Sequence, residues 1–222
     1  MSNALSDRVG VDTARPTTTR MALLVAAIAL GGLGNLANLL FGWNGDDLTV
    51  EWFASHQQAW VASTYGNALN ALGLFALLVA VCVLVKGRGA AWATVSLVIG
   101  SLGTALYAVS AAIPVAFTAM GTQTVVPPAQ AAQLADYFHR HEMTQSAVAF
   151  PSFLLLTVTQ ITITVALIRS RAVPLWVPIV FLAFGALAIV FAASGVLTAV
   201  LTVPQIVAMV AIGWYAKTRA AA

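Results

Sequence analysis

The sequence predicts an all-α integral membrane protein, a bundle of six transmembrane helices. Composition is the first reason: 60% of the 222 residues are hydrophobic and only 8% are charged, whereas soluble domains carry about 25% charged residues. Hydropathy is the second, with a mean of +0.92 over the chain. The third is the grouping of apolar residues into six runs, each near the roughly 20 residues that cross a bilayer. Much of the surface must therefore face lipid.

The six runs follow one another within residues 20–217, which we interpret as a single transmembrane domain. Residues 1–19 are polar and of mixed charge, which predicts a disordered cytoplasmic tail, and residues 218–222 form a second short tail. The first run is too long for a signal peptide and lacks a cleavage site, so it is expected to stay as a membrane anchor. The predicted spans are 21–43, 60–85, 90–113, 144–168, 173–193 and 197–216.

Basic residues predict how the spans are oriented. They lie before the first span, between the second and third, between the fourth and fifth, and after the sixth, and only Arg140 falls on the other side. Because positive charge favours the cytoplasmic side, both termini are expected in the cytoplasm. The tryptophans fall at the ends of the spans, as an aromatic belt requires. The alanine- and arginine-rich composition indicates a bacterial protein, and hence the plasma membrane.

A short pattern of glycine, small residue, leucine and small residue recurs in the odd-numbered spans, beginning at Gly31, Gly100 and Gly185. The outer loops carry a related repeat, since Glu51 and His56 are followed 85 positions later by Asp136 and His141. These offsets predict three quasi-repeated parallel hairpins, each rising outward and returning. The small residues are expected to let the helices approach closely.

The predicted spans hold no Asp, Glu, Lys, Arg or His, which disfavours proton relays and ion-coupled transport. Neutral polar residues remain, among them two asparagine pairs whose spacing of three places each pair on one helical face. One interpretation is hydrogen bonding between helices, worth about 0.6 kcal/mol per contact. The other is an outward-opening pocket that orients a small ligand. The candidate ligand-binding residues are Asn35, Asn38, Asn67, Asn70, Tyr65, Tyr107 and Gln160.

The outer loops contain all three histidines and most of the acidic residues. Residues 48–58 and 130–142 suit short amphipathic helices that lie in the membrane interface. An outer polar cluster is predicted there, which acts as an interfacial cap, a pH-sensitive lid or a catalytic site. We predict no metal site, because Glu51 and Asp136, five positions before His56 and His141, lie on a different helical face from those histidines. The cluster consists of Glu51, His56, Asp136, His139, His141 and Glu142.

The sequence holds no phosphate-binding loop, no dinucleotide fingerprint, no nucleophile elbow and no zinc-binding HExxH helix. No lysine or histidine lies in a span to hold retinal or haem, so no cofactor is expected. These absences favour a non-catalytic accessory module, or one that binds lipid or a small ligand. The alternatives are a small permease with an asparagine-lined pocket and a membrane enzyme with a histidine and carboxylate site on the outer face.

The expected partners are the lipid bilayer and either another membrane protein or a second copy of the chain. Nucleic acid is not expected, because the basic residues flank the spans and form no binding face.

Overall fold

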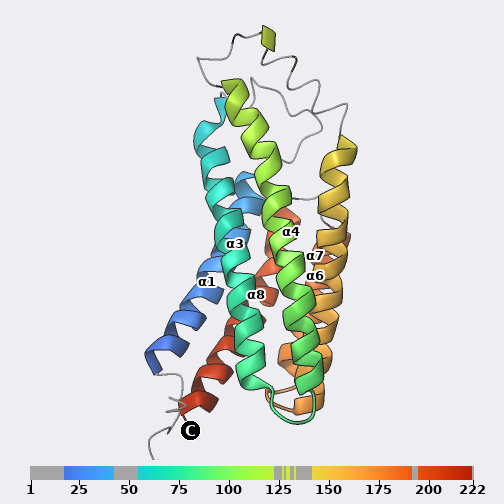
Figure 1. Ribbon diagram of the computed structural model, residues 1–222. Coiled ribbons are helices and arrows are strands. Elements are labelled where there is room, and N and C mark those ends of the chain that lie inside the picture. The colour runs from blue at the N-terminus through green and yellow to red at the C-terminus, as the bar shows by residue number, and fades with distance from the viewer. Residues whose placement is uncertain are drawn as a thin grey trace, which may run out of the picture.

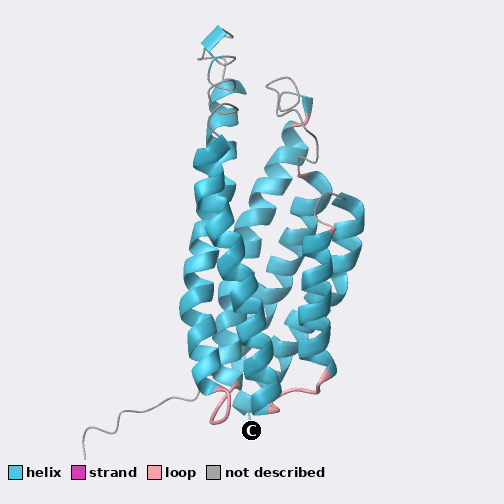
Figure 2. Ribbon diagram, turned by 90° about the vertical axis from the view of Figure 1, so that its right-hand side faces the viewer, coloured by secondary structure: helices cyan, strands magenta, loops and turns pink. Residues whose placement is uncertain are grey.

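The computed structural model describes residues 18–42, 55–122, 142–191 and 195–221, with a few isolated residues between 127 and 133. The described part is all-helical and contains no strand (Figure 2). This agrees with the all-α class that the composition predicts. The helices are α1 (Thr18–Phe41), α3 (Gln57–Leu84), α4 (Ala90–Thr122), α6 (Glu142–Ser170), α7 (Trp176–Val190) and α8 (Gly195–Ala221).

Five of these helices are long and apolar enough to cross a membrane, and α7 is the shorter one. Its 15 residues reach about 22 Å at a rise of 1.5 Å per residue, against about 30 Å of bilayer hydrocarbon. The predicted span 173–193 begins three residues too early. Pro174 explains the difference, because a residue before proline is disfavoured in helical conformation, and α7 begins only after it.

The helices form a closed ring in chain order. α1 contacts α3, α3 contacts α4, and the series continues through α6, α7 and α8 back to α1. α3 also contacts α8 inside the ring. Figure 1 shows neighbouring helices running in alternate directions, with the start of α1 and the end of α8 at the same end of the bundle. Each pair of consecutive helices therefore forms an up-and-down hairpin.

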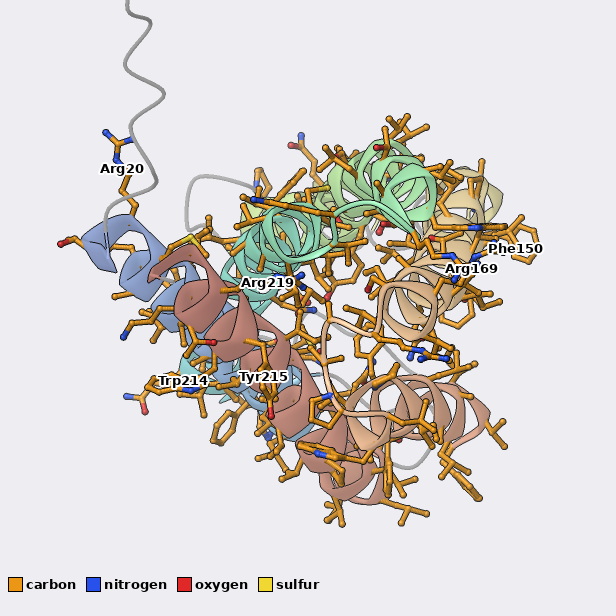
Figure 3. All side chains as sticks on the ribbon, turned by 90° about the horizontal axis from the view of Figure 1, so that it is seen from below. Arg20, Phe150, Arg169, Trp214, Tyr215 and Arg219 are labelled. Atoms are coloured by element: carbon orange, nitrogen blue, oxygen red, sulfur yellow. The ribbon has the colours of Figure 1, made fainter. Side chains whose placement is uncertain are left out.

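The described basic side chains all lie at this end of the bundle, which we call the basic end. Figure 3 views it directly, with Arg20, Arg169 and Arg219 labelled. The Arg219 Nη1 atom donates a hydrogen bond of 3.3 Å to the carbonyl oxygen of Leu84, the last residue of α3. A cation at a helix C-terminus stabilises the unpaired carbonyls there. The described basic residues are Arg20, Lys86, Arg88, Arg169, Arg171, Lys217 and Arg219.

The apolar core fills the half of the bundle nearest the basic end. Leu84 of α3, Leu167 of α6 and Ile212 of α8 are all fully buried there. Large apolar side chains also cover the outside of the bundle, including Phe150, which is 70% exposed and points away from the helices (Figure 3). An apolar exterior around an apolar core is the pattern of a helix bundle surrounded by lipid.

Glycines bring α1 and α3 unusually close together. A Cβ atom added at Gly31 would lie 2.5 Å from the Cα atom of Gly73, and one added at Gly34 would lie 2.5 Å from the carbonyl oxygen of Gly66. Backbone therefore meets backbone at both levels, which only residues without a side chain permit. This close approach places the polar side chains of α1 and α3 within hydrogen-bonding reach of each other.

Candidate functional site

A cavity of about 450 Å³ lies in the half of the bundle away from the basic end. Residues from all six helices line it, so it sits at the centre of the ring. None of its lining residues is Asp, Glu, Lys, Arg or His. Leu77, Ile163 and Met209 belong to both the lining and the apolar core, and they form its floor toward the basic end. The polar lining residues are Asn35, Asn70, Thr104, Tyr107, Ser110, Ser152, Thr157, Thr159, Gln160, Thr198, Thr202 and Gln205.

One wall of the cavity is backed by a hydrogen-bonded network that links α1, α3 and α4. The Asn38 Oδ1 atom accepts bonds from Ser63 Oγ at 2.7 Å and from Asn67 Nδ2 at 3.0 Å. The Asn67 Oδ1 atom in turn accepts a bond from the Tyr107 hydroxyl. Asn38 and Asn67 lie behind the lining residues, between α1 and α3.

The same tyrosine connects the second asparagine pair. Asn70 Nδ2 donates to the Tyr107 hydroxyl at 3.3 Å and to Asn35 Oδ1 at 3.4 Å. Asn70 is buried, whereas Asn35 and Tyr107 are half-buried, and all three line the cavity. The Tyr107 hydroxyl therefore donates to one asparagine pair and accepts from the other, which joins them into a single network.

The opposite wall is formed by two glutamines that meet at Gly185. Gln160 Nε2 of α6 donates a 2.7 Å bond to the carbonyl oxygen of Phe181 on α7. A Cβ atom at Gly185 would overlap that nitrogen and would lie 2.7 Å from Gln205 Nε2 of α8. The missing side chain at Gly185 therefore makes room for both amides: Gln160 bonds α6 to α7, and Gln205 of α8 lies beside the same glycine.

Thr104 of α4 differs from the other buried hydroxyl residues. Its side chain is fully buried and lines the cavity, yet its Oγ1 atom has no hydrogen-bond partner among the described residues. Threonines in helices usually donate to a backbone carbonyl one turn earlier. Thr159 and Thr202, which line the same cavity, do so at 2.7 Å each.

Four of the seven candidate ligand-binding residues line the cavity: Asn35, Asn70, Tyr107 and Gln160. Asn38 and Asn67 bond to that group without lining it. Tyr65 lies apart, because its side chain is 69% exposed on the outside of α3.

The outer polar cluster lies largely outside the described residues. This holds for Glu51, Asp136, His139 and His141, and for the side chain of Glu142 at the start of α6. His56 is exposed just before α3, and its Nδ1 atom is 2.9 Å from Ser55 Oγ. The predicted interfacial helices at 48–58 and 130–142 also fall mostly outside the described part. Within that part, no group of three or more His, Cys, Asp or Glu residues is placed to hold a metal ion.

Sequence reasoning missed Thr104 and the meeting of the two glutamines. The recurring glycine pattern pointed to part of this arrangement, because one of its glycines, Gly185, is the residue beside which Gln160 and Gln205 meet. Thr104 stands four residues after Gly100, the first residue of the same pattern in α4, but nothing in that spacing indicates a hydroxyl without a partner.

No family model, curated protein or solved structure matches the chain.

Proposed function

We infer that this chain is a non-catalytic membrane module that binds a small, uncharged and largely apolar molecule, such as a lipid, in the central cavity. The cavity itself carries this proposal, because its volume of about 450 Å³ is within the range of roughly 300–1,000 Å³ typical of ligand pockets. Most of its lining surface is apolar, as in ligand pockets generally, although twelve of the lining residues have polar side chains.

The absence of charge in the lining supports an uncharged ligand. A charged ligand held at this depth needs a partner of opposite charge, because an unpaired ion in a low-dielectric interior is costly. The lining offers only amides and hydroxyls. These groups suit hydrogen bonding to a neutral molecule.

The asparagines favour a binding module over the permease. The permease requires amides that face a path between α1 and α3, whereas Asn67 bonds to Asn38 and Asn70 bonds to Asn35 across that interface. The glycine contacts of α1 and α3 also close the interface to a passing solute.

We place the protein in the plasma membrane with both termini in the cytoplasm, and we count α7 as a sixth span. The gathering of the described basic residues at one end supports this orientation. The cavity then lies in the outer half of the membrane. The three hairpins α1 with α3, α4 with α6, and α7 with α8 are each packed internally, which is consistent with three parallel repeats.

Filling the cavity tests the proposed function. Ala149 lines the cavity, whereas Ala147, two residues earlier on α6, is exposed. In lipid nanodiscs, calorimetric titration with acetylnaphthalene, a neutral bicyclic ketone, should show saturable binding to the wild type. Ala149→Phe should abolish this binding and Ala147→Phe should preserve it. Binding that is lost in both variants, or in neither, contradicts the proposal.

A further inference from the structure

We propose that Asn35 and Gln205 form a polar site in the cavity that recognises an uncharged carboxamide group on an otherwise apolar molecule. This inference rests on the proposed binding function and adds the chemical class of the ligand. Both side chains line the cavity and are half-buried. Both also keep amide groups that no described residue binds.

Asn35 is the end of the hydrogen-bonded network, and its nitrogen is left without an acceptor. The Tyr107 hydroxyl gives its hydrogen to Asn67, so it accepts from Asn70. The second hydrogen of Asn70 Nδ2 goes to Asn35 Oδ1. The Asn35 oxygen is therefore turned toward Asn70. Its Nδ2 atom is turned the other way and has no hydrogen-bond partner in the described part of the chain.

Gln205 of α8 makes no side-chain hydrogen bond to any described residue, through either its oxygen or its nitrogen. Its Nε2 atom lies 2.7 Å from the position of a Cβ atom at Gly185, which is a buried residue. The amide therefore points into the bundle and not toward lipid. The neighbouring Gln160 differs, because its nitrogen already donates to the carbonyl oxygen of Phe181.

Accessible surface separates these two amides from Thr104. The Thr104 Oγ1 atom is enclosed by protein, and among the described residues it is the single enclosed side-chain oxygen or nitrogen without a partner. The unpartnered amide atoms of Asn35 and Gln205 are therefore not enclosed, and the open space that these residues border is the cavity. A ligand in the cavity can reach both amides, whereas the Thr104 hydroxyl is covered.

The two amides lie at nearly the same depth on neighbouring helices. A Cβ atom at Gly32 of α1 would lie 2.5 Å from the Ile206 side chain of α8, so the helices touch at this level. Asn35 is three residues farther from the basic end than Gly32. Gln205 is one residue farther than Ile206, because α8 runs in the opposite direction to α1 (Figure 1). At 1.5 Å per residue, their depths differ by about 3 Å, so one ligand group can contact both.

A carboxamide matches the hydrogen bonds that this site leaves open. The Asn35 nitrogen offers a donor and the Gln205 oxygen offers an acceptor, on side chains from different helices. A carboxamide carries its acceptor oxygen and its donor nitrogen on separate atoms, so it can bond to both side chains. A ketone leaves the Gln205 oxygen unused, and a hydroxyl has its donor and acceptor on one atom. An ion would need an opposite charge, which the lining lacks.

Three probes of the same shape separate these bonds. Naphthalenecarboxamide has an amino group where acetylnaphthalene has a methyl group, so the ketone keeps the carbonyl acceptor and loses the donor. Isopropenylnaphthalene has a methylene group in place of the ketone oxygen and forms neither bond. Affinities are measured by calorimetry in nanodiscs, with empty nanodiscs subtracted. Comparing affinity ratios between variants cancels the different solubility of the probes in lipid.

Gln205→Met tests the acceptor, because methionine keeps the length of the side chain and removes the amide. It should lower the ratio of carboxamide affinity to ketone affinity about five- to tenfold, the value of one hydrogen bond. Thr202→Val is the matched control and should keep the wild-type ratio. Thr202 is buried, lines the cavity and donates to the Thr198 carbonyl. An unchanged ratio in Gln205→Met overturns the carboxamide assignment.

Asn35→Leu tests the donor. It should weaken binding of the carboxamide and of the ketone about five- to tenfold each, because both have the carbonyl oxygen. Binding of the alkene should not change. If the alkene weakens as much as the ketone does, the effect of Asn35 is on the shape of the cavity, and its role in recognition is overturned.

Stability without ligand is a further measurement on Gln205→Met. This variant should unfold at the same or a higher denaturant concentration than the wild type, because the amide that it removes has no partner in the described structure. A clear loss of stability would show that Gln205 serves packing of the bundle and would overturn the assignment. Acetylnaphthalene binding that depends on position 149 but shows no effect at Gln205 leaves the proposed function standing. If no probe binds the wild type, both proposals fail.

Discussion

Tyr107 is the residue on which the polar network depends. Its hydroxyl bonds to Asn67 of one asparagine pair and to Asn70 of the other. A substitution that deletes only this oxygen leaves one amide acceptor and one amide donor without a partner in the interior of the bundle. Such groups are costly where water is scarce.

Tyr107→Phe should therefore lower the free energy of unfolding by about 1–2 kcal/mol. The measurement is reversible unfolding by SDS in mixed micelles. Tyr65→Phe is the matched control, since Tyr65 is 69% exposed and its substitution should change stability by less than about 0.5 kcal/mol. Equal effects at the two tyrosines would mean that the network contributes nothing measurable.

Two glycines in the turn between α3 and α4 differ in what a side chain would meet. A side chain would strain the backbone at both positions, but it would also clash with a neighbouring helix at only one of them. Gly87 has φ of 68° and an added Cβ would meet nothing within 4 Å. Gly89 has φ of 103°, and an added Cβ would lie 2.7 Å from the carbonyl oxygen of Ala166 on α6. Both positions favour glycine because left-handed conformations are strained for other residues.

Gly87→Ala should cost about 1–2 kcal/mol, the strain of a left-handed alanine. Gly89→Ala should cost more than Gly87→Ala, because the added carbon also collides with backbone that cannot rotate away. Thermal unfolding of the two variants in the same detergent measures the difference. A smaller loss at Gly89 would show that the turn moves freely away from α6.

At the level of elements, α1 and α3 are the pair that brings the asparagines together. The contact depends on Gly31 and Gly73, because a side chain at either would strike the Cα atom of the other. Because the two helices pack closely at these glycines, Asn38 of α1 lies opposite Asn67 of α3, and Asn35 lies opposite Asn70. Packing and polar pairing therefore stabilise the same interface.

Gly31→Ala should push α1 away from α3 and destabilise the bundle by about 1–3 kcal/mol, the usual cost of overpacking. It should also weaken the asparagine bonds, so that adding Asn67→Ala to it costs less than Asn67→Ala costs alone. A double-mutant cycle in the SDS unfolding assay tests this coupling. Ala26→Val adds carbon atoms at an exposed position of the same helix and should have little effect.

The short helix α7 has a distinct role among the elements. Its Phe181 carbonyl receives the Gln160 amide, and its Gly185 makes room for Gln160 and Gln205. At the cavity wall, a hydrogen bond thus joins α7 to α6, and the amide of Gln205 places α8 close to Gly185. The part of α7 that lines the cavity runs from Phe181 to Ile189.

Across the whole molecule, the two ends of the bundle differ in chemistry. The half toward the basic end is packed with apolar side chains, and the other half contains the cavity and its polar walls. The proposed function therefore depends on the proposed orientation. If the basic end is cytoplasmic, the cavity lies nearer to the outer side of the membrane.

Cysteine labelling of intact bacterial cells tests the orientation. Cys82 is the single native cysteine, so Cys82→Ala provides a background without thiols. In that background, a membrane-impermeant maleimide should label Gln58→Cys in intact cells, because Gln58 is exposed near the start of α3. Arg88→Cys, at the basic end, should be labelled only after permeabilisation. The reverse pattern would invert the proposed topology.

The class of the protein and the approximate extent of five long helices were predictable from the amino-acid sequence. The reason is general: in lipid a chain must satisfy its backbone hydrogen bonds internally, so long apolar runs become helices. The fifth predicted span was less accurate, since α7 begins only at Trp176, after Pro174. Helical spacing also placed the two asparagines of each pair on one face.

The site needed the tertiary structure, because its residues come from all six helices. Helical periodicity specifies which residues share a face of one helix, but it does not specify which helix that face meets. The exposure of Tyr65 and the meeting of Gln160 with Gln205 at Gly185 are consequences of the ring arrangement. Thr104 is the clearest case. Whether a threonine hydroxyl bonds to its own helix or is left without a partner depends on its side-chain rotamer, and neighbouring helices select that rotamer through packing.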